Sequence, residues 1–335
     1  MWLALLSASL FPTQVHLPLP DAARVAIVGR DVVAISGGGK GVVLVGDGKG
    51  HFQPGARFEA GDNIASVAVA DVNGDGKPDL VVAHHERKYL TVLPGPLYAK
   101  GRQIPIEVTP HGHFAAVADL DGDGKADLVV NDMGGKRVVV LWGKGDGSFT
   151  GSTAASTGSK GYAYINVAIA AGRLFVPTWP QPQLAVLRAQ KRELRQEALL
   201  ELPNPSFFAV AADFDGDGVP DVAVATFSGN FADGTRDGIV FFSGGHAPGK
   251  LYPSGRGPTA LAAGDVDGDG LADLAVCNQA GDAVTVLLGG RSGLREGATL
   301  PAPHPQGIAL GDLDGDGKAD LAVAAQDEVI VFLTR

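Results

Sequence analysis

The sequence predicts an all-β protein, a seven-bladed β-propeller of four-stranded antiparallel blades whose last blade is closed by the N-terminal strand. Three observations predict this fold: an acidic nonapeptide recurs at regular spacing, each copy lies in the same strand pattern, and the two chain ends complement each other. Repeats with periods of about 20 to 50 residues are typical of propellers and solenoids. The 335 residues are therefore expected to form one closed array rather than two or three ordinary domains.

Five nonapeptides define the repeat, and they read DVNGDGKPD, DLDGDGKAD, DFDGDGVPD, DVDGDGLAD and DLDGDGKAD from Asp71, Asp119, Asp213, Asp265 and Asp312. Their starts are 48, 94, 52 and 47 residues apart. Because 94 is twice 47, a repeat without an acidic loop is expected near Asn166, where INVAIAAGR precedes LFVPT. A similar repeat is expected near Arg24, in ARVAIVGRDVVAIS. Five full repeats and two degenerate ones make seven.

Each repeat predicts four strands, as the copy beginning near Ala65 illustrates. It reads SVAVADV, the acidic loop, DLVVAHH, a short break, YLTVLPG and a more polar segment through Val108. Glycine-rich turns at 45–52, 142–149 and 288–294 join third to fourth strands, because glycine supplies the positive φ that a hairpin needs. First strands are rich in Ala, Val and Gly, as expected where blades converge on an axis.

The two chain ends predict closure of the last blade. The last repeat ends after its third strand at 329–335, whereas TQVHLPLPD at 13–21 resembles the fourth strand ATLPAPHPQ at 298–306. Closure removes an exposed sheet edge. A β-sandwich or an open solenoid would not explain why the strand missing from the last repeat is found at the opposite terminus. The expected blades are 21–62, 63–110, 111–158, 159–203, 204–256, 257–300 and 301–335 with 13–20.

The first residues resemble an export signal. Residues 1–12 begin with an apolar run ending in small residues, MWLALLSAS, although no basic residue precedes Arg24. An edge strand or a misplaced start codon would give the same run. We expect a secreted, periplasmic or cell-surface protein. No apolar stretch is long enough to span a bilayer.

The charge distribution argues for a bound cation and against a nucleic-acid partner. The formal net charge is −10, and no basic cluster is longer than Lys191-Arg192, whereas phosphate binding needs a basic patch. The five loops hold 19 of the 37 acidic residues, so five divalent cations would bring the net charge to about zero. Cys277 is the only cysteine, which excludes intramolecular disulfides and a cysteine-rich zinc site.

Oxygen ligands that alternate along a glycine-containing loop suit Ca²⁺, and about five ions are expected. The first, third, fifth and ninth side chains and the seventh carbonyl of each loop should coordinate the ion. The expected ligand residues are Asp71, Asn73, Asp75, Lys77 and Asp79; Asp119, Asp121, Asp123, Lys125 and Asp127; Asp213, Asp215, Asp217, Val219 and Asp221; Asp265, Asp267, Asp269, Leu271 and Asp273; and Asp312, Asp314, Asp316, Lys318 and Asp320. Position twelve is Val rather than the Glu of an EF-hand, which argues against a calcium-sensor helix pair.

These loops and the GDGxF-like turns resemble those of FG-GAP and VCBS-type repeat proteins, a group that includes integrin α propellers and many exported bacterial proteins. The resemblance covers nearly the whole chain. It implies calcium between the first and second strands of the five acidic blades and none in the two degenerate blades. It also implies that ligands contact the opposite face.

Aromatic and polar residues gather in the segments expected on that opposite face, and they suit a sugar or peptide ligand. Any one of them could equally be an ordinary loop residue that packs on a neighbouring blade. The ligand-face candidates are His84, His85, Arg87, Tyr89, His111, His113, Tyr162, Tyr164, Trp179, Phe207, Asn278 and His304.

Two functions of different classes remain open from the sequence. The first is a calcium-stabilised extracellular binding or adhesion module, monomeric, with an unidentified protein or glycan as partner. The alternative is a carbohydrate-active enzyme such as a polysaccharide lyase, for which Glu86 and Asp132 could form a carboxylate pair. No catalytic residue is assigned: HERKY at His85 has Tyr89 where a zinc protease needs its second His, no G-x-S-x-G occurs, and Cys277 at a strand end predicts an inert thiol. A purely structural domain is the third reading.

Overall fold

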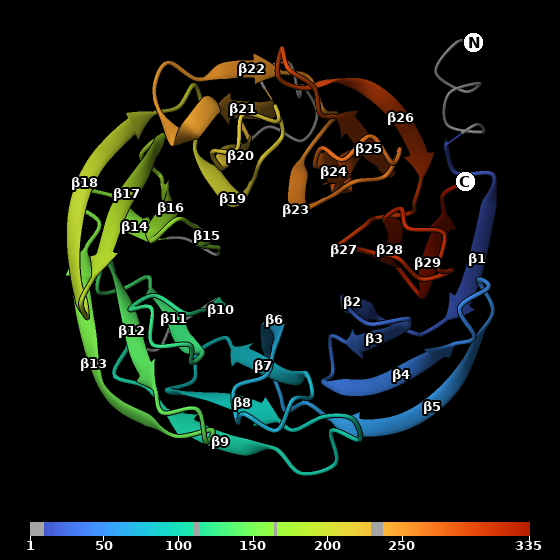
Figure 1. The fold of residues 1–335 in the computed structure, drawn as a ribbon, viewed down its shortest axis with the longest axis horizontal. Coiled ribbons are helices and arrows are strands. Elements are labelled where there is room, and N and C mark those ends of the chain that lie inside the picture. The colour runs from blue at the N-terminus through green and yellow to red at the C-terminus, as the bar shows by residue number, and fades with distance from the viewer. Residues whose placement is uncertain (1–9, 110–113, 164–165, 229–236) are drawn as a thin grey trace. The chain divides into compact units, whose positions relative to one another are not determined.

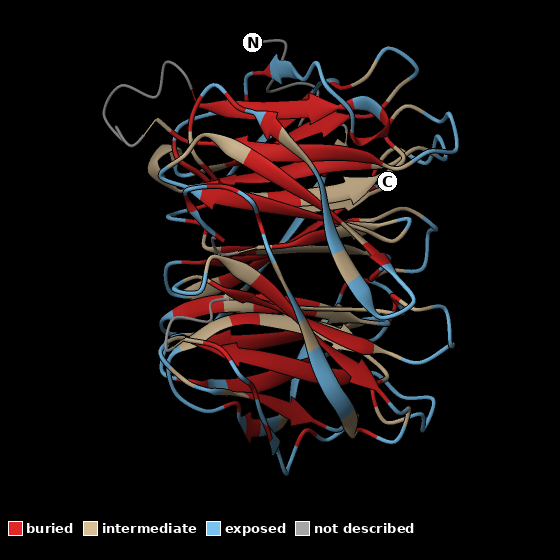
Figure 2. Ribbon diagram, turned by 90° about the vertical axis from the view of Figure 1, so that its left-hand side faces the viewer, coloured by how far each residue is buried: buried red, intermediate tan, exposed pale blue. Residues whose placement is uncertain are grey.

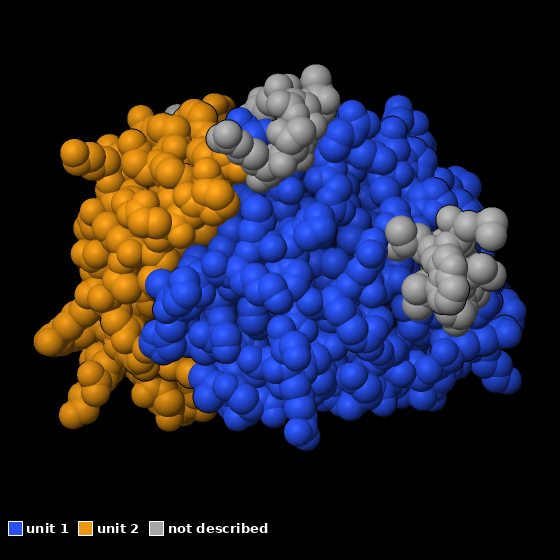
Figure 3. Space-filling model, turned by 90° about the horizontal axis from the view of Figure 1, so that it is seen from above, with its two compact units in different colours: residues 1–37, 41–56, 210–335 blue, residues 38–40, 57–209 orange. Residues whose placement is uncertain are grey.

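The computed structural model describes residues 10–109, 114–163, 166–228 and 237–335. These residues form seven antiparallel sheets, and each sheet is one blade with the four-strand pattern of the repeat (Figure 1). The prediction of a seven-bladed β-propeller is confirmed. The chain divides into two compact units (Figure 3): unit 1 comprises residues 1–37, 41–56 and 210–335, and unit 2 comprises 38–40 and 57–209.

Unit 1 contains four blades and two short 3₁₀ turns. The strands of its blades are β2 (Ala22–Val28), β3 (Asp31–Ser36), β4 (Lys40–Gly46) and β5 (Phe52–Glu59); β19 (Ser206–Ala212), β20 (Asp221–Thr226), β21 (Gly238–Phe242) and β22 (Lys250–Tyr252); β23 (Pro258–Gly264), β24 (Asp273–Asn278), β25 (Ala283–Leu288) and β26 (Arg295–Pro301); and β27 (Gly307–Gly311), β28 (Asp320–Ala325), β29 (Glu328–Leu333) and β1 (Thr13–Pro18). The turns are η1 (Ser243–Gly245) and η2 (Gln279–Gly281). None of the described helices has the length and apolarity needed to cross a membrane.

Unit 2 contains three blades. Their strands are β6 (Ile64–Ala70), β7 (Asp79–His84), β8 (Tyr89–Leu93) and β9 (Arg102–Pro105); β10 (Ala115–Ala118), β11 (Asp127–Asp132), β12 (Arg137–Gly143) and β13 (Phe149–Ser156); and β14 (Tyr162–Ala163), β15 (Ala168–Ala170), β16 (Arg173–Trp179), β17 (Gln183–Gln190) and β18 (Glu193–Glu201). In the last of these blades the first strand is broken, because β14 and β15 both pair with β16.

The second strand of each acidic blade carries the core. Every residue of β7, β11, β20, β24 and β28 is buried, and buried strands flanked by exposed turns are visible in Figure 2. These strands are largely apolar on both faces, as expected for strands that are covered on both sides. A fourth strand such as β13 alternates instead between exposed and partly buried residues. Each acidic loop is thus attached to a fully buried strand.

The N-terminal strand closes the last blade, as predicted. Strand β1 pairs antiparallel with β29, from Thr13 opposite Leu333 to Pro18 opposite Glu328. Val15 and Leu17 pack against the buried side chains of β29. The pairing of β1 with β29 therefore buries apolar surface and also gives the backbone N–H and C=O groups at the edge of β29 their hydrogen-bond partners.

Two residues before β1 also pack on unit 1. Phe11 is 2% exposed, and its ring centroid lies 6.5 Å from that of Phe332 in an edge-to-face arrangement. Leu10 packs against the same cluster. Residues 1–9 lie outside the described residues, so export by this segment stays a prediction.

The two blades without acidic loops replace the loop with a short turn. Gly29 and Arg30 connect β2 to β3, and Ala171 and Gly172 connect β15 to β16. Both glycines have positive φ, +61° and +71°, a conformation that glycine adopts without steric cost. The spacing of the acidic repeats had predicted both blades.

Candidate metal loops and ligand-binding edge

Each acidic loop joins the first and second strands of its blade and curls through its own hydrogen bonds. In the loop 119–127, Asp119 Oδ1 accepts the N–H of Gly122 at 2.8 Å and its Oδ2 accepts the N–H of Gly124 at 2.9 Å. Asp121 Oδ1 accepts the N–H of Asp123 at 3.1 Å. Both glycines have φ near +80°. Equivalent bonds recur in the other four loops, so the five loops share one conformation.

The ninth aspartate fastens each loop to the sheet. Asp127 is buried; its Oδ2 accepts the N–H of Leu120 at 2.9 Å and its Oδ1 accepts the N–H of Gly143, at the end of the third strand, at 2.8 Å. The ninth residues of the other loops make the corresponding two bonds: Asp79, Asp221, Asp273 and Asp320. The loop position is therefore fixed relative to two strands of its blade.

Burial raises the pKa of all five ninth-position carboxyls, and the neighbouring carboxylates of the same loop raise it further. The pKa values of Asp273 and Asp320 rise to about 6. Each loop therefore concentrates negative charge where water is partly excluded. A bound cation would relieve this repulsion.

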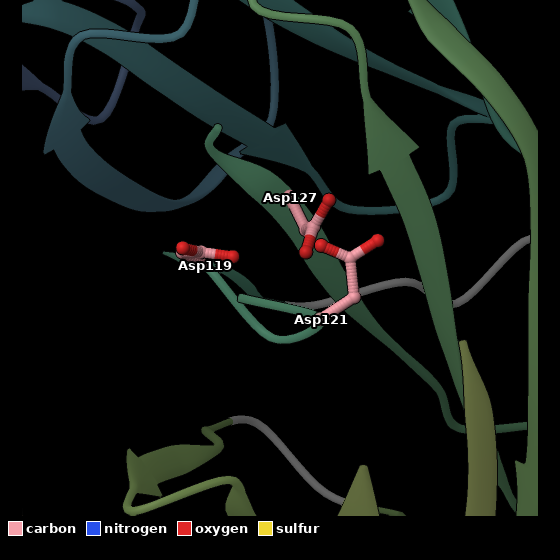
Figure 4. A group of neighbouring side chains, drawn as sticks. All are labelled: Asp119, Asp121 and Asp127. Carbon is pink, nitrogen blue, oxygen red and sulfur yellow. The ribbon is translucent and has the colours of Figure 1, made fainter. Parts of the chain in front are cut away.

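The carboxylates converge closely enough to share an ion. In four loops, one oxygen from each of three aspartates lies within 4.8 Å of the others; the groups are Asp119, Asp121 and Asp127; Asp213, Asp215 and Asp221; Asp265, Asp267 and Asp269; and Asp312, Asp314 and Asp316. Figure 4 shows the first group, with the carboxylates of Asp121 and Asp127 close together and that of Asp119 across the loop. Oxygens bonded to one Ca²⁺ at about 2.3 to 2.6 Å can lie up to about 5.2 Å apart, so the donor set fits this ion.

The remaining loop, 71–79, has an asparagine instead of an aspartate at its third position. Asn73 donates from Nδ2 to Asp79 Oδ1 at 3.1 Å, while its Oδ1 accepts the N–H of Asp75 at 2.9 Å. The amide thus leaves loop 71–79 one carboxylate short of the other four. Its ligands stay a prediction, as do the coordinating roles of the remaining loop residues.

Two ligand-face candidates belong to the interior. His84 and Asn278 are each 1% exposed, and both end the second strand of their blade. His84 Nδ1 donates to the carbonyl of Asp62 at 2.7 Å, and Nε2 accepts from the Thr91 hydroxyl at 2.8 Å. Asn278 likewise binds a threonine hydroxyl and the carbonyl of Ser254. Both side chains join a blade to the chain segment that precedes it.

The other described candidates lie nearer the surface. Arg87 pairs with Asp62, the ring centroid of Tyr89 lies 5.0 Å from that of His84, and His85 lies beside Glu86. Phe207 is half-buried and His304 is exposed. His111, His113 and Tyr164 lie outside the described residues.

Tyr162 and Trp179 form an exposed aromatic pair. They are cross-strand partners in β14 and β16, with ring centroids 6.5 Å apart and planes 22° apart. They are 37% and 39% exposed. The Lys136 ammonium lies 5.2 Å from the Tyr162 centroid and donates to the carbonyl of Lys160 at 2.7 Å. Trp179 is the last residue of β16, and the turn that replaces the acidic loop of this blade lies at the other end of that strand.

Comparison with known proteins agrees with the loop geometry. The FG-GAP-like repeat family matches residues 30–82, 109–172, 213–276 and 265–323. The chain belongs to this family. A search among curated proteins finds no significant match to this FG-GAP-like repeat protein.

Solved structures share the fold of this FG-GAP-like repeat protein at low identity. BBS1N, solved in complex with ARL6DN, is 16% identical with a TM-score of 0.65 over 98% of both chains. The WD40 domain of Toxoplasma gondii coronin is 12% identical, with a TM-score of 0.66 over 96% of this chain and 86% of that one. Kuenenia stuttgartiensis hydrazine synthase is 16% identical, with a TM-score of 0.64 over 96% and 98%. These likenesses concern the fold alone.

The structure gives Asp132, named above as a candidate for a catalytic carboxylate pair, a structural role, and it adds Arg192, which the sequence did not single out as a site residue. Asp132 is buried and accepts from Arg137 Nε at 2.7 Å and from the Thr109 hydroxyl, so it fastens a blade to its preceding segment. Arg192 reaches the loop 119–127 from another blade. Its signal in the sequence was the basic pair Lys191-Arg192, placed in a blade that lacks an acidic loop.

His84 predicts a pH-dependent stability. Burial lowers the pKa of His84, so the unfolded chain binds a proton more readily than the folded one. The stability that neutral His84 contributes is present above the unfolded pKa of about 6.5 and is lost as the pH falls below it. We expect His84→Gln to reduce the fall in melting temperature between pH 7.5 and pH 5.5.

The control for this measurement is His51→Gln, because the His51 side chain is 79% exposed. Each variant is compared with the wild-type protein at both pH values, which cancels the contribution of the shared carboxylates. If the melting temperature of His84→Gln falls with pH as much as that of the wild type, buried His84 does not contribute to the pH dependence of stability.

Proposed function

We propose that this FG-GAP-like repeat protein is a calcium-stabilised extracellular binding module whose ligand contacts the blade edges opposite the acidic loops. The observation that carries the proposal is the convergence of three carboxylates within 4.8 Å in each of four loops. Such crowding destabilises a folded chain unless a cation compensates it. Residues with this arrangement and no His or Cys ligand favour a hard cation.

The chain's own residues prepare the site in two ways. The first, third and fifth side chains shape the loop through backbone N–H groups, and the ninth side chain anchors it to the sheet. Bound Ca²⁺ would supply the positive charge that holds these carboxylates together. The expected ligand residues are those named for the five loops, and we propose one ion for each loop.

The aromatic pair Tyr162 and Trp179 supports the ligand-binding part of the proposal. Aromatic rings present large apolar faces with little conformational freedom to lose, and they are enriched where proteins bind ligands. Lys136 adds a positive charge beside the Tyr162 ring. The pair therefore suits a glycan, with an extracellular peptide as the second class of partner.

The binding test uses an array of neutral and uronic-acid oligosaccharides with the full chain in 1 mM calcium. For each oligosaccharide bound, we expect Tyr162→Ala and Trp179→Ala to weaken affinity at least about tenfold, because buried aromatic contacts dominate binding energy. Leu97→Ala is the matched control, since Leu97 is an exposed apolar residue of the same unit.

Equal binding by Tyr162→Ala, Trp179→Ala and Leu97→Ala would contradict the assignment of this edge. Incubation with uronic-acid polymers separates the enzyme alternative, because a lyase releases unsaturated products. If unsaturated products are released, and if Tyr162→Ala and Trp179→Ala do not abolish that release, the protein is a carbohydrate-active enzyme rather than a binding module.

A further inference from the structure

Arg192 connects a blade without an acidic loop to the loop 119–127. It lies in the turn between β17 and β18, and its side chain crosses to the neighbouring blade of unit 2. Nε lies 2.5 Å from Asp121 Oδ2, and Nη2 lies 3.3 Å from Asp123 Oδ2. The Asp121 side chain is 8% exposed. The guanidinium therefore contacts two carboxylates expected to bind the ion.

The backbone of Arg192 is held separately from its side chain. The Thr153 hydroxyl donates to the Arg192 carbonyl at 2.9 Å and accepts the indole N–H of Trp142 at 2.9 Å. The guanidinium carbon lies 5.7 Å from the Trp142 ring centroid. Because the carbonyl anchors the turn, the side chain can leave the carboxylates without unfolding the turn. Trp142 is a fluorophore beside the guanidinium, so its emission can report whether the Arg192 side chain leaves the carboxylates.

The other loops lack this arrangement in the part of the chain that the structure describes. Asp267 has a single contact with Arg295, 3.2 Å long and within one blade. Asp215 Oδ2 accepts the neutral Ser243 hydroxyl at 3.1 Å. Only loop 119–127 receives, among the described residues, a cation from another blade on two of its carboxylates.

We propose that Arg192 is an internal competitor of the cation at loop 119–127, and this inference rests on the proposed function. In the ion-free protein the guanidinium pairs with Asp121 and Asp123 and offsets part of their negative charge. A divalent ion that binds these carboxylates has the same sign of charge, and it needs the Asp121 carboxylate that Nε–H already contacts. Ion binding must therefore displace Arg192.

Two consequences follow from this competition. Loop 119–127 should bind calcium more weakly than loops 213–221 and 312–320, whose carboxylates form no ion pair with an arginine within the described residues. Its filling should release the contact between the two blades. Coupling between two linked sites typically changes affinity about 5- to 150-fold, and we expect about tenfold here.

The experiment measures calcium binding by titration calorimetry together with Trp142 emission. Trp2→Phe and Trp179→Phe leave Trp142 as the only tryptophan of the three. In this background we compare wild-type Arg192 with Arg192→Gln and Arg192→Lys. Arg195→Gln is the matched control, since Arg195 lies three residues further along, in β18, and among the described residues its ion pair is with Glu193 at 2.6 Å.

With Arg192 present, we expect the change in Trp142 emission to follow the calcium-binding step of loop 119–127, at a higher calcium concentration than the filling of loops 213–221 and 312–320. Arg192→Gln should tighten that step about tenfold, and its ion-free emission should already resemble that of the calcium-bound parent. Arg192→Lys should lie between the two, and it provides the test if Arg192→Gln does not fold. Arg195→Gln should change nothing.

Two negative results are distinguishable. Calcium binding with every step within twofold of the parent in both Arg192 variants would overturn this inference alone. Absence of calcium binding to the parent at every loop would overturn the proposed function and this inference with it.

Discussion

In excess chelator, the protein should unfold roughly 10 to 15 °C below its melting temperature in 1 mM calcium. A site with a dissociation constant near 0.1 mM gains about 1.4 kcal/mol at this concentration, so five independent sites gain about 7 kcal/mol. That amount is comparable to the whole stability of an ordinary domain, about 5 to 15 kcal/mol. The crowded carboxylates of each loop supply the physical reason, because they repel one another until a cation binds.

Thermal unfolding by calorimetry or intrinsic fluorescence measures this effect, and added calcium should restore the melting temperature. Asp213→Asn with Asp215→Asn removes two of the three converging carboxylates of one loop. This variant should lose about a fifth of the chelator effect. A melting temperature independent of chelator in the wild-type protein would contradict the stabilising role of the loops.

Removal of residues 1–20 should destabilise the protein by about 5 kcal/mol and promote association. The deletion removes β1, exposes the edge of β29, and eliminates Phe11, Val15 and Leu17 from the core clusters of unit 1. Burial of one large apolar side chain contributes about 1.5 to 3 kcal/mol. An unpaired edge strand is also a template for pairing with another chain.

The matched control is removal of residues 1–9, which leaves Leu10, Phe11 and β1 in place. Melting temperature and size-exclusion chromatography at several concentrations measure both effects, with calcium held at 1 mM. A synthetic peptide of residues 10–20 should restore the melting temperature of the shorter protein. The closure assignment fails if the two truncations behave alike.

The repeat spacing made the fold predictable from the sequence. Five loops of constant length placed the first and second strands of five blades, and the double interval of 94 residues located a sixth near Asn166. The apparent lack of a fourth strand after Leu333 predicted the pairing with β1. These inferences succeeded because each depends on local pattern and period, which a repeat fold preserves.

The contacts of individual side chains were less predictable. His84 and Trp179 both end a second strand, yet one is buried and the other exposed, since burial depends on the preceding segment of the chain. Arg192 is 71 residues from Asp121 in sequence, so no local pattern could pair them. The break between β14 and β15 depends likewise on how one first strand meets β16.

The pairing of β1 with β29 has a consequence for biosynthesis. The paired residues are 310 to 320 positions apart, so β1 must wait for β29 to be synthesised before it can pair. At about 5 to 20 residues per second this delay is roughly 15 to 60 s. Throughout that interval the nascent chain carries an unpaired strand, which a chaperone or export factor would have to shield until β29 has been synthesised.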